Sequence, residues 1–149
     1  MLEKHNNISV LKYQRMTAML FLGTAFSLFD FWWTFYSEIT EVLMPVFKHD
    51  LIENSYLEYK YFGFWLEATL AALMLITSAG LWFSKGLKLT KILALSCSLS
   101  SVVLGAGYLF TGMSSNFYSH AERYVSILFT LDISLVIVGI LGLVMINRS

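Results

Sequence analysis

Three acidic residues stand inside stretches of sequence that are otherwise apolar and aromatic. Asp30 lies in SLFDFWWTFYSE, Glu67 in FWLEATLAA and Asp132 in TLDISL. Desolvation and mutual repulsion both oppose ionisation of carboxyl groups in such surroundings, so these acids must share protons or find a cation or a donor. Groups of this kind could transfer protons or hold a cationic ligand.

The segments that carry these acids are long enough to cross a lipid bilayer. A spanning helix needs about 20 apolar residues, and charged residues make up only 13% of this chain, against about 25% in an ordinary soluble domain. Since a backbone in lipid must satisfy its own hydrogen bonds, each apolar segment should be a helix. The sequence predicts an all-α integral membrane protein, a single four-transmembrane-helix bundle over 1–149 with spans at about 16–36, 61–83, 92–112 and 124–146.

Basic residues are distributed unevenly between the two ends of the predicted bundle. One side carries Lys4, Lys12, Arg15, Lys85, Lys88, Lys91 and Arg148, and the other carries Lys48, Lys60 and Arg123. The positive-inside rule then predicts that the amino and carboxyl termini are both cytoplasmic. The connection 37–60 would lie on the outer side, where the helical spacing of its apolar residues predicts an amphipathic segment.

The predicted orientation places the three acids in one band of depth. At a rise of about 1.5 Å per residue, Asp30 and Glu67 lie roughly 9 Å below the outer boundary and Asp132 roughly 12 Å below it. None of the predicted spans contains Lys, Arg or His, so we expect no internal cation. The acids are therefore predicted to turn towards one another around a cleft in the outer half of the bundle.

Aromatic residues accompany the acids in this band. Aromatic faces attract cations, so acids and rings together suit a cationic or lipid-like ligand. Two simpler interpretations stay open: each acid could be protonated and bonded to a nearby hydroxyl, and the rings could form an interfacial belt. The predicted site has Asp30 and Glu67 as catalytic carboxyls, with ligand contacts from Trp33, Trp65, Tyr108 and Asp132.

Other kinds of chemistry find little support in the sequence. The three His residues fall outside the predicted spans and Cys97 is the single cysteine, so we expect no metal and no cofactor. The formal net charge is zero, which argues against a nucleic-acid partner. Small residues at Gly23/Ser27, Ser101/Gly105 and Gly139/Gly142 predict close helix packing.

Several of these motifs resemble the emopamil-binding (EXPERA) superfamily. The similar stretches are FDFWWTFYSE, WLEATLAALM, GAGYLF and SNFYSHAERY, within about residues 16–146. The resemblance implies a pocket for sterol-like or cationic amphiphilic molecules, with Asp30 and Glu67 matching the family's acids. Isomerases of that group carry a His one turn before the first acid, where this chain has Phe26, and a neutral polar residue about where Asp132 stands. These differences favour ligand binding over isomerase activity.

A second resemblance is to small DoxX-like four-helix membrane proteins. It rests on WLEATLAALMLITSAGLWF and ILALSCSLSSVVLGAGYLF, which a short basic turn connects. That family implies little beyond a membrane bundle, which is sometimes associated with redox or quinone-linked partners.

The sequence thus leaves three functional hypotheses open. The first is a pocket for a lipid-like or cationic amphiphilic ligand, with isomerase- or cyclase-like proton transfer between the acids and a double bond as its enzymatic form. The second is a subunit of a larger membrane complex or homo-oligomer, whose partner satisfies the acids. The third is a small proton-coupled carrier, in which the carboxyls bind and release protons.

Overall fold

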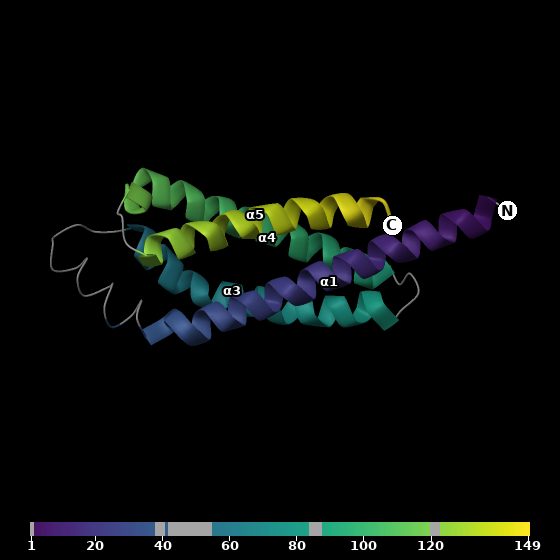
Figure 1. The fold of residues 1–149 in the computed structure, drawn as a ribbon, viewed down its shortest axis with the longest axis horizontal. Helices are drawn as coiled ribbons and strands as arrows, with labels where there is room; N and C mark the ends of the chain where they lie inside the picture. Colours follow the sequence, from purple (N-terminus) through teal and green to yellow (C-terminus); the bar gives the residue numbers. More distant parts are fainter. Residues whose placement is uncertain (1, 38–40, 42–54, 84–87, 120–122) are drawn as a thin grey trace.

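The structure is a computed structural model that describes residues 2–37, 41, 55–83, 88–119 and 123–149. Within these residues the chain is entirely helical and contains no strand (Figure 1). Four of the helices are long and apolar enough to cross a membrane, which indicates a multi-pass membrane protein. They are α1 (Leu2–Ser37), α3 (Ser55–Phe83), α4 (Lys88–Ser114) and α5 (Arg123–Asn147), and a short 3-10 helix, η2 (Phe117–Ser119), follows α4.

The four long helices form an up-and-down bundle. Each packs against the next along the chain, and α5 returns to pack against α1. Both termini lie at the same end of the bundle, with the end of α3 and the start of α4, and α1 extends beyond the other helices there (Figure 1). The opposite end holds the end of α1, the start of α3 and η2.

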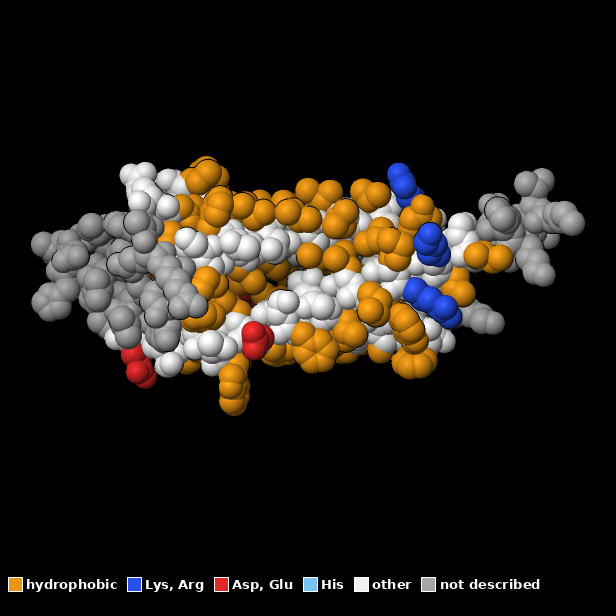
Figure 2. Space-filling view, viewed as in Figure 1, with side chains coloured by type: hydrophobic (Ala, Val, Ile, Leu, Met, Phe, Trp, Pro, Cys, Tyr) orange, Lys and Arg blue, Asp and Glu red, His pale blue; other side chains and the backbone are white. Residues whose placement is uncertain are grey.

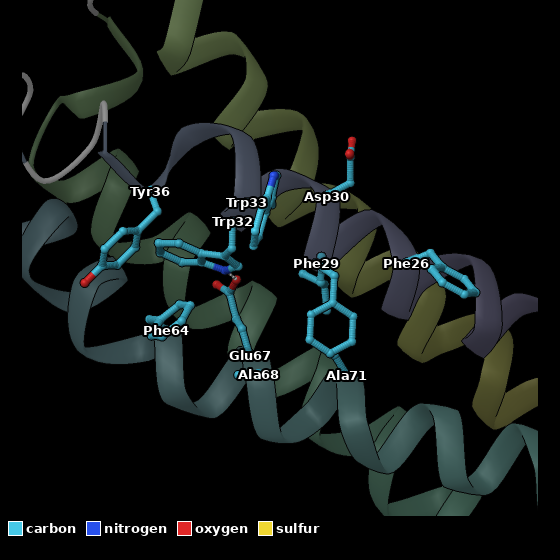
Figure 3. Close-up of a pocket in the computed structure, with 11 residues that line it drawn as sticks. Phe26, Phe29, Asp30, Trp32, Trp33, Tyr36, Phe64, Glu67, Ala68 and Ala71 are labelled. Atoms are coloured by element: carbon cyan, nitrogen blue, oxygen red, sulfur yellow. Dashed lines mark hydrogen bonds between the residues drawn. The ribbon is translucent and has the colours of Figure 1, made fainter.

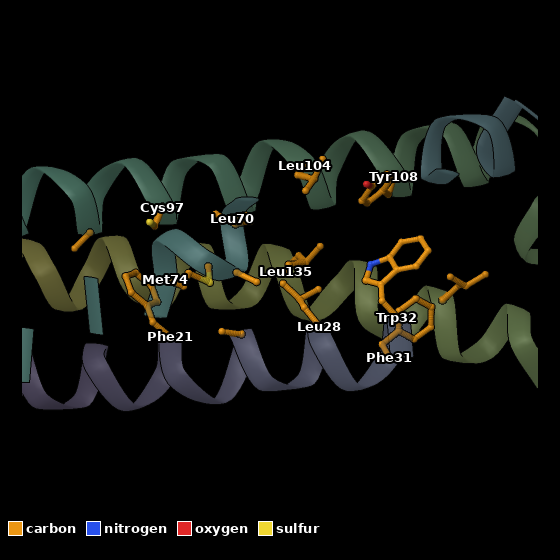
Figure 4. Close-up of a cluster of buried hydrophobic side chains, with 14 of the residues drawn as sticks. Phe21, Leu28, Phe31, Trp32, Leu70, Met74, Cys97, Leu104, Tyr108 and Leu135 are labelled. Carbon is orange, nitrogen blue, oxygen red and sulfur yellow. The ribbon is translucent and has the colours of Figure 1, made fainter. Parts of the chain in front are cut away.

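Buried side chains recur along each helix at alternating spacings of three and four residues. This 3.5-residue period produces the interlocking packing of coiled coils, and the apolar layers are formed by side chains such as Leu28, Leu70 and Leu135 (Figure 4). On α3 the buried series is Tyr56, Lys60, Gly63, Glu67, Leu70, Met74, Thr77 and Leu81, and on α5 it includes Leu128, Asp132 and Leu135. Three charged residues therefore occupy core positions.

Small residues let α4 and α5 approach closely, as predicted. A Cβ atom on Gly105 would lie 2.8 Å from the carbonyl oxygen of Asp132, and one on Gly139 would lie 2.5 Å from that of Ser98. The Ser101 hydroxyl donates to the Leu135 carbonyl oxygen at 2.7 Å. Gly23 differs, because a Cβ there would meet nothing within 4 Å.

The predicted segments match the four helices in number and order, but one boundary matters. We predicted the second span at 61–83, whereas α3 begins at Ser55 and so includes Lys60. Most of the predicted connection 37–60, with the amphipathic segment, falls in 38–40 and 42–54, which lie outside the described residues.

The visible surface of the bundle is mostly apolar between its ends (Figure 2). Large exposed side chains include Trp33 at 92%, Phe62 at 74% and Phe110 at 72%. The Lys and Arg side chains visible in this view gather near the end that carries the termini. An apolar belt with a basic end is the surface that lipid contact favours.

Candidate functional site

A buried group of polar side chains, here called the polar centre, lies in the half of the bundle away from the termini. Its charged members come from α3 and α5. Its neutral members, which are hydrogen-bond donors and aromatic rings, come from α1, α3, α4 and η2. The members are Trp32, Tyr56, Lys60, Glu67, Tyr108, Tyr118 and Asp132. The three charged side chains are all 0% exposed.

Lys60 is the hub of the polar centre. Its Nζ lies 2.7 Å from Oε1 of Glu67 and 2.8 Å from Oδ1 of Asp132. The same atom lies 3.8 Å from the centre of the Tyr108 ring, at cation–π range. An ammonium group has three donors, and these two carboxylates and one ring account for all of them.

The second oxygen of each carboxylate is also hydrogen-bonded. The Trp32 indole Nε1 donates to Oε2 of Glu67 at 2.5 Å. The hydroxyls of Tyr56 and Tyr118 donate to Oδ2 of Asp132 at 2.5 and 2.7 Å. Both carboxylates therefore hold a cation on one oxygen and neutral donors on the other.

The surroundings of Asp132 keep the neighbouring Tyr118 hydroxyl protonated. Tyr118 belongs to η2 and lies outside the four candidate spans. Burial raises the pKa of its hydroxyl, and the negative charge of Asp132 raises that pKa further. Tyr118 therefore stays protonated and remains a donor to Asp132.

The prediction that the bundle contains no internal cation was wrong. Lys60 was assigned to the outer connection, but α3 starts at Ser55, before the predicted span, and carries Lys60 into the core. On one helix face, Lys60 and Glu67 are seven residues apart, so both point to the same seam. The signal was in the sequence as the run Tyr56, Lys60, Gly63 and Glu67, whose spacing of four, three and four marks a buried face.

The structure brings two of the three predicted acids together and leaves the third apart. Glu67 and Asp132 share Lys60, and Tyr108 lies over it. Asp30 is exposed on α1 and points away from Glu67 (Figure 3). The predicted convergence of Asp30 with Glu67 is therefore not observed.

A groove between α1 and α3 lies beside the polar centre, with a volume of about 640 Å³. Its walls are mainly aromatic and apolar, and the Trp32–Glu67 pair forms its inner polar wall (Figure 3). Asp30 and the exposed Trp33 also line this groove, which we call the α1/α3 groove. Glu67 itself is covered, because its side chain has no exposed surface.

The remaining predicted ligand contacts are divided between the interior and the surface. Trp65 is 74% exposed on α3 and does not line the α1/α3 groove. Tyr108 and Asp132 are fully buried in the polar centre. Sequence reasoning also missed Tyr56 and Tyr118, which it did not connect to Asp132.

Within the described part of the chain, no cluster of three or more His, Cys, Asp or Glu side chains could hold a metal ion. Here Cys97 is buried and lies 3.7 Å from the Thr77 hydroxyl oxygen. The cation that the two carboxylates hold is the chain's own lysine.

Comparisons with known proteins add no relative: no family model matches the chain, and no curated protein and no solved structure is significantly similar to it. The class that the fold defines is a multi-pass four-helix membrane protein. A narrower assignment of function has to rest on the side chains of the polar centre and of the α1/α3 groove.

Proposed function

We propose that this chain is an integral membrane protein with both termini in the cytoplasm, which binds a lipid-like or cationic amphiphilic molecule in the α1/α3 groove. Four apolar helices and a basic end that carries both termini support the placement. A reporter that fluoresces only in the cytoplasm, fused after Ser149, should be active. Inactivity there, with activity of a reporter that works only outside, would reverse the orientation.

The observation that carries the ligand proposal is the composition of the α1/α3 groove. Side chains such as Phe26, Phe29 and Phe64 offer apolar walls, and Phe26 and Phe29 are also exposed at the surface. Polar groups occur at two places, at Asp30 on one edge and at the Trp32–Glu67 pair on the inner wall. A tail among rings with a cationic head near a carboxylate matches this arrangement.

Binding fits the geometry better than proton transfer. Glu67 and Asp132 both contact the Lys60 ammonium, and their other oxygens accept hydrogen bonds from Trp32, Tyr56 and Tyr118, so neither carboxyl turns a free oxygen towards the groove. Isomerase- or cyclase-like chemistry would then depend on Asp30 alone, whose carboxyl lies at the edge of the groove and points away from Glu67 (Figure 3). The EXPERA and DoxX resemblances both remain predictions.

The ligand proposal can be tested with a dansyl-labelled long-chain alkylamine and the protein in nanodiscs. Energy transfer from Trp32 and Trp33 to the dansyl group should saturate. Ala68→Leu, which narrows the groove, should weaken binding about tenfold or more, by more than about 1.4 kcal/mol. Ala79→Leu is the matched control, since Ala79 is exposed on α3 outside the groove lining. Equal binding by both variants would refute the site.

The polar centre supports a second candidate, a proton-coupled carrier. Two carboxyl groups contact one lysine inside the bundle, and ionisable groups within spanning helices are typical of proton relays in transporters. In liposomes containing a trapped pH dye, adding the same alkylamine outside should produce a proton movement that Asp132→Asn abolishes. No movement with the wild-type protein would remove this candidate.

A further inference from the structure

The outer face of α1 and α5 carries a row of polar groups on an otherwise apolar surface. We call it the α1/α5 face, and it consists of Gly23, Ser27 and Asp30 from α1 with Ser126, Thr130 and Ser134 from α5. All six are exposed. They are three or four residues apart on each helix, which places each set along one side. Two hollows lie there between the helices, and Ser27, Leu131 and Ser134 line both of them.

Asp30 is the charged residue of this face. No side chain among the described residues forms a hydrogen bond or an ion pair with it. Large exposed aromatics flank it (Figure 3), with Phe29 45% and Trp33 92% exposed, so the carboxyl lies among apolar side chains. An acid on the lipid-facing side of a spanning helix is unfavourable until a partner reaches it.

The hydroxyls beside Asp30 present acceptors outward. Ser27 donates its proton to the Gly23 carbonyl oxygen at 2.9 Å. Thr130 donates to the Ser126 carbonyl oxygen at 2.8 Å, and Ser134 donates to that of Thr130 at 2.7 Å. These hydroxyl protons are used within their own helices, so the face offers oxygen lone pairs and one carboxylate. A group rich in donors complements it.

The same face lets another backbone come close. Gly23 and Ser27 form a small-xxx-small pair of the type that packs spanning helices together. Inside the chain such pairs are filled, since Gly105 and Gly139 face neighbouring backbone at under 3 Å from an added Cβ. At Gly23 an added Cβ meets nothing within 4 Å, so the described part of the chain leaves this space open.

We infer that the α1/α5 face binds a transmembrane helix of another protein that carries a Lys or Arg at the depth of Asp30. A second copy of this chain fits less well, because it would set acceptors against acceptors. Among the described side chains at this depth, the basic one is Lys60, which is buried and paired. This inference rests on the proposed membrane placement but not on ligand binding in the α1/α3 groove.

The probe is a synthetic Leu/Ala-rich transmembrane peptide with one Lys, inserted with the protein into lipid nanodiscs. A matched peptide has Leu in place of that Lys. Energy transfer between labelled peptide and labelled protein measures association. The Lys peptide should associate at least about fivefold more tightly than the Leu peptide, and Asp30→Asn should remove this difference. Asp30→Lys should reverse the preference, binding a peptide that carries Asp.

Variants separate this surface from the rest of the molecule. Gly23→Leu should block the Lys peptide but leave thermal unfolding and alkylamine binding unchanged. Ala68→Leu should do the opposite, lowering alkylamine binding and sparing the peptide. Equal association of the Lys and Leu peptides, or undiminished association with Asp30→Asn, would overturn the inference. Self-association that Gly23→Leu abolishes, in place of peptide binding, would also overturn it in favour of a second copy.

Discussion

The polar centre and the α1/α5 face both contain acidic residues, but they differ in the partners that surround these residues. Inside the bundle, Glu67 and Asp132 each have a lysine and neutral donors around them. On the outside, Asp30 has no such partner among the described side chains. A buried acid that is fully paired serves the fold, whereas an exposed acid in an apolar belt is available for binding. The acids that looked equivalent in sequence therefore have different roles.

The largest expected effect comes from removing the cation that the two buried acids share. Lys60→Met would leave Glu67 and Asp132 adjacent and uncompensated, which should lower the free energy of unfolding by about 3–5 kcal/mol. Unfolding in mixed detergent micelles measures this change. In the control, Lys60→Met with Glu67→Gln and Asp132→Asn, much of the loss should be recovered. A loss of under about 1 kcal/mol for Lys60→Met alone would show that the lysine is not the hub.

The next effect contrasts a filled glycine position with an open one. Gly139→Leu must push against the backbone of α4, and we expect a loss of at least about 1–3 kcal/mol in the free energy of unfolding. Gly23→Leu faces open space and should change it by less than about 0.5 kcal/mol. Thermal unfolding in one detergent compares the two. Equal losses would mean that Gly23 also packs within the chain.

A smaller effect is expected at the edge of the polar centre. Tyr118→Phe removes one of the donors to Asp132 and should cost about 1.5 kcal/mol of stability, the size of a hydrogen bond to a charged group. Ser119→Ala, on an exposed neighbour, is the control and should change little. If both variants unfold alike, the Tyr118 bond contributes nothing.

The same side chain also predicts a pH dependence. Burial and Asp132 raise the pKa of Tyr118 in the folded protein, whereas a tyrosine in the unfolded chain ionises near about pH 10. The contribution of Tyr118 is thus complete below about pH 10 and declines as pH rises further, because the unfolded state loses the proton first. Unfolding of the wild type above about pH 10 should depend more steeply on pH than that of Tyr118→Phe. Identical slopes would contradict this.

The smallest effect on stability is expected at Asp30. Because no described side chain bonds to it, Asp30→Asn should change the free energy of unfolding by less than about 0.5 kcal/mol. The matched change Asp132→Asn should be markedly destabilising, since it disturbs Lys60 and two tyrosines. Unfolding of the two variants under one condition is the comparison. A large loss for Asp30→Asn would place it in the fold.

The sequence was sufficient for the four helices because length and apolarity decide whether a segment can span. It also predicted that Glu67, Asp132 and Tyr108 would come close together. It missed Lys60, because a lysine near the end of an apolar segment is usually taken as the end of that segment. The spacing from Tyr56 to Glu67 shows that the buried face continues past that boundary.

Asp30 shows the other limit of prediction from the sequence. Its depth could be estimated by counting residues, but its direction depends on which side of α1 meets α3 and α5. The inner side of α1 is defined by the buried residues Leu28, Phe31 and Trp32. Asp30 lies between them in the sequence but on the outer side of the helix. In a spanning helix the side that faces lipid and the side that faces the core are both apolar. The sequence therefore does not show which side is which.

The most direct test is the reaction of each carboxyl with dicyclohexylcarbodiimide, an apolar reagent that modifies carboxyl groups it can reach from lipid. The purified protein in nanodiscs is treated briefly, digested and analysed by mass spectrometry. The account predicts modification of the exposed Asp30, with Glu67 and Asp132 protected by burial in the wild type and more reactive in Lys60→Met, where the packing of the polar centre is disturbed. Modification of Glu67 or Asp132 as fast as that of Asp30 in the wild type would contradict it.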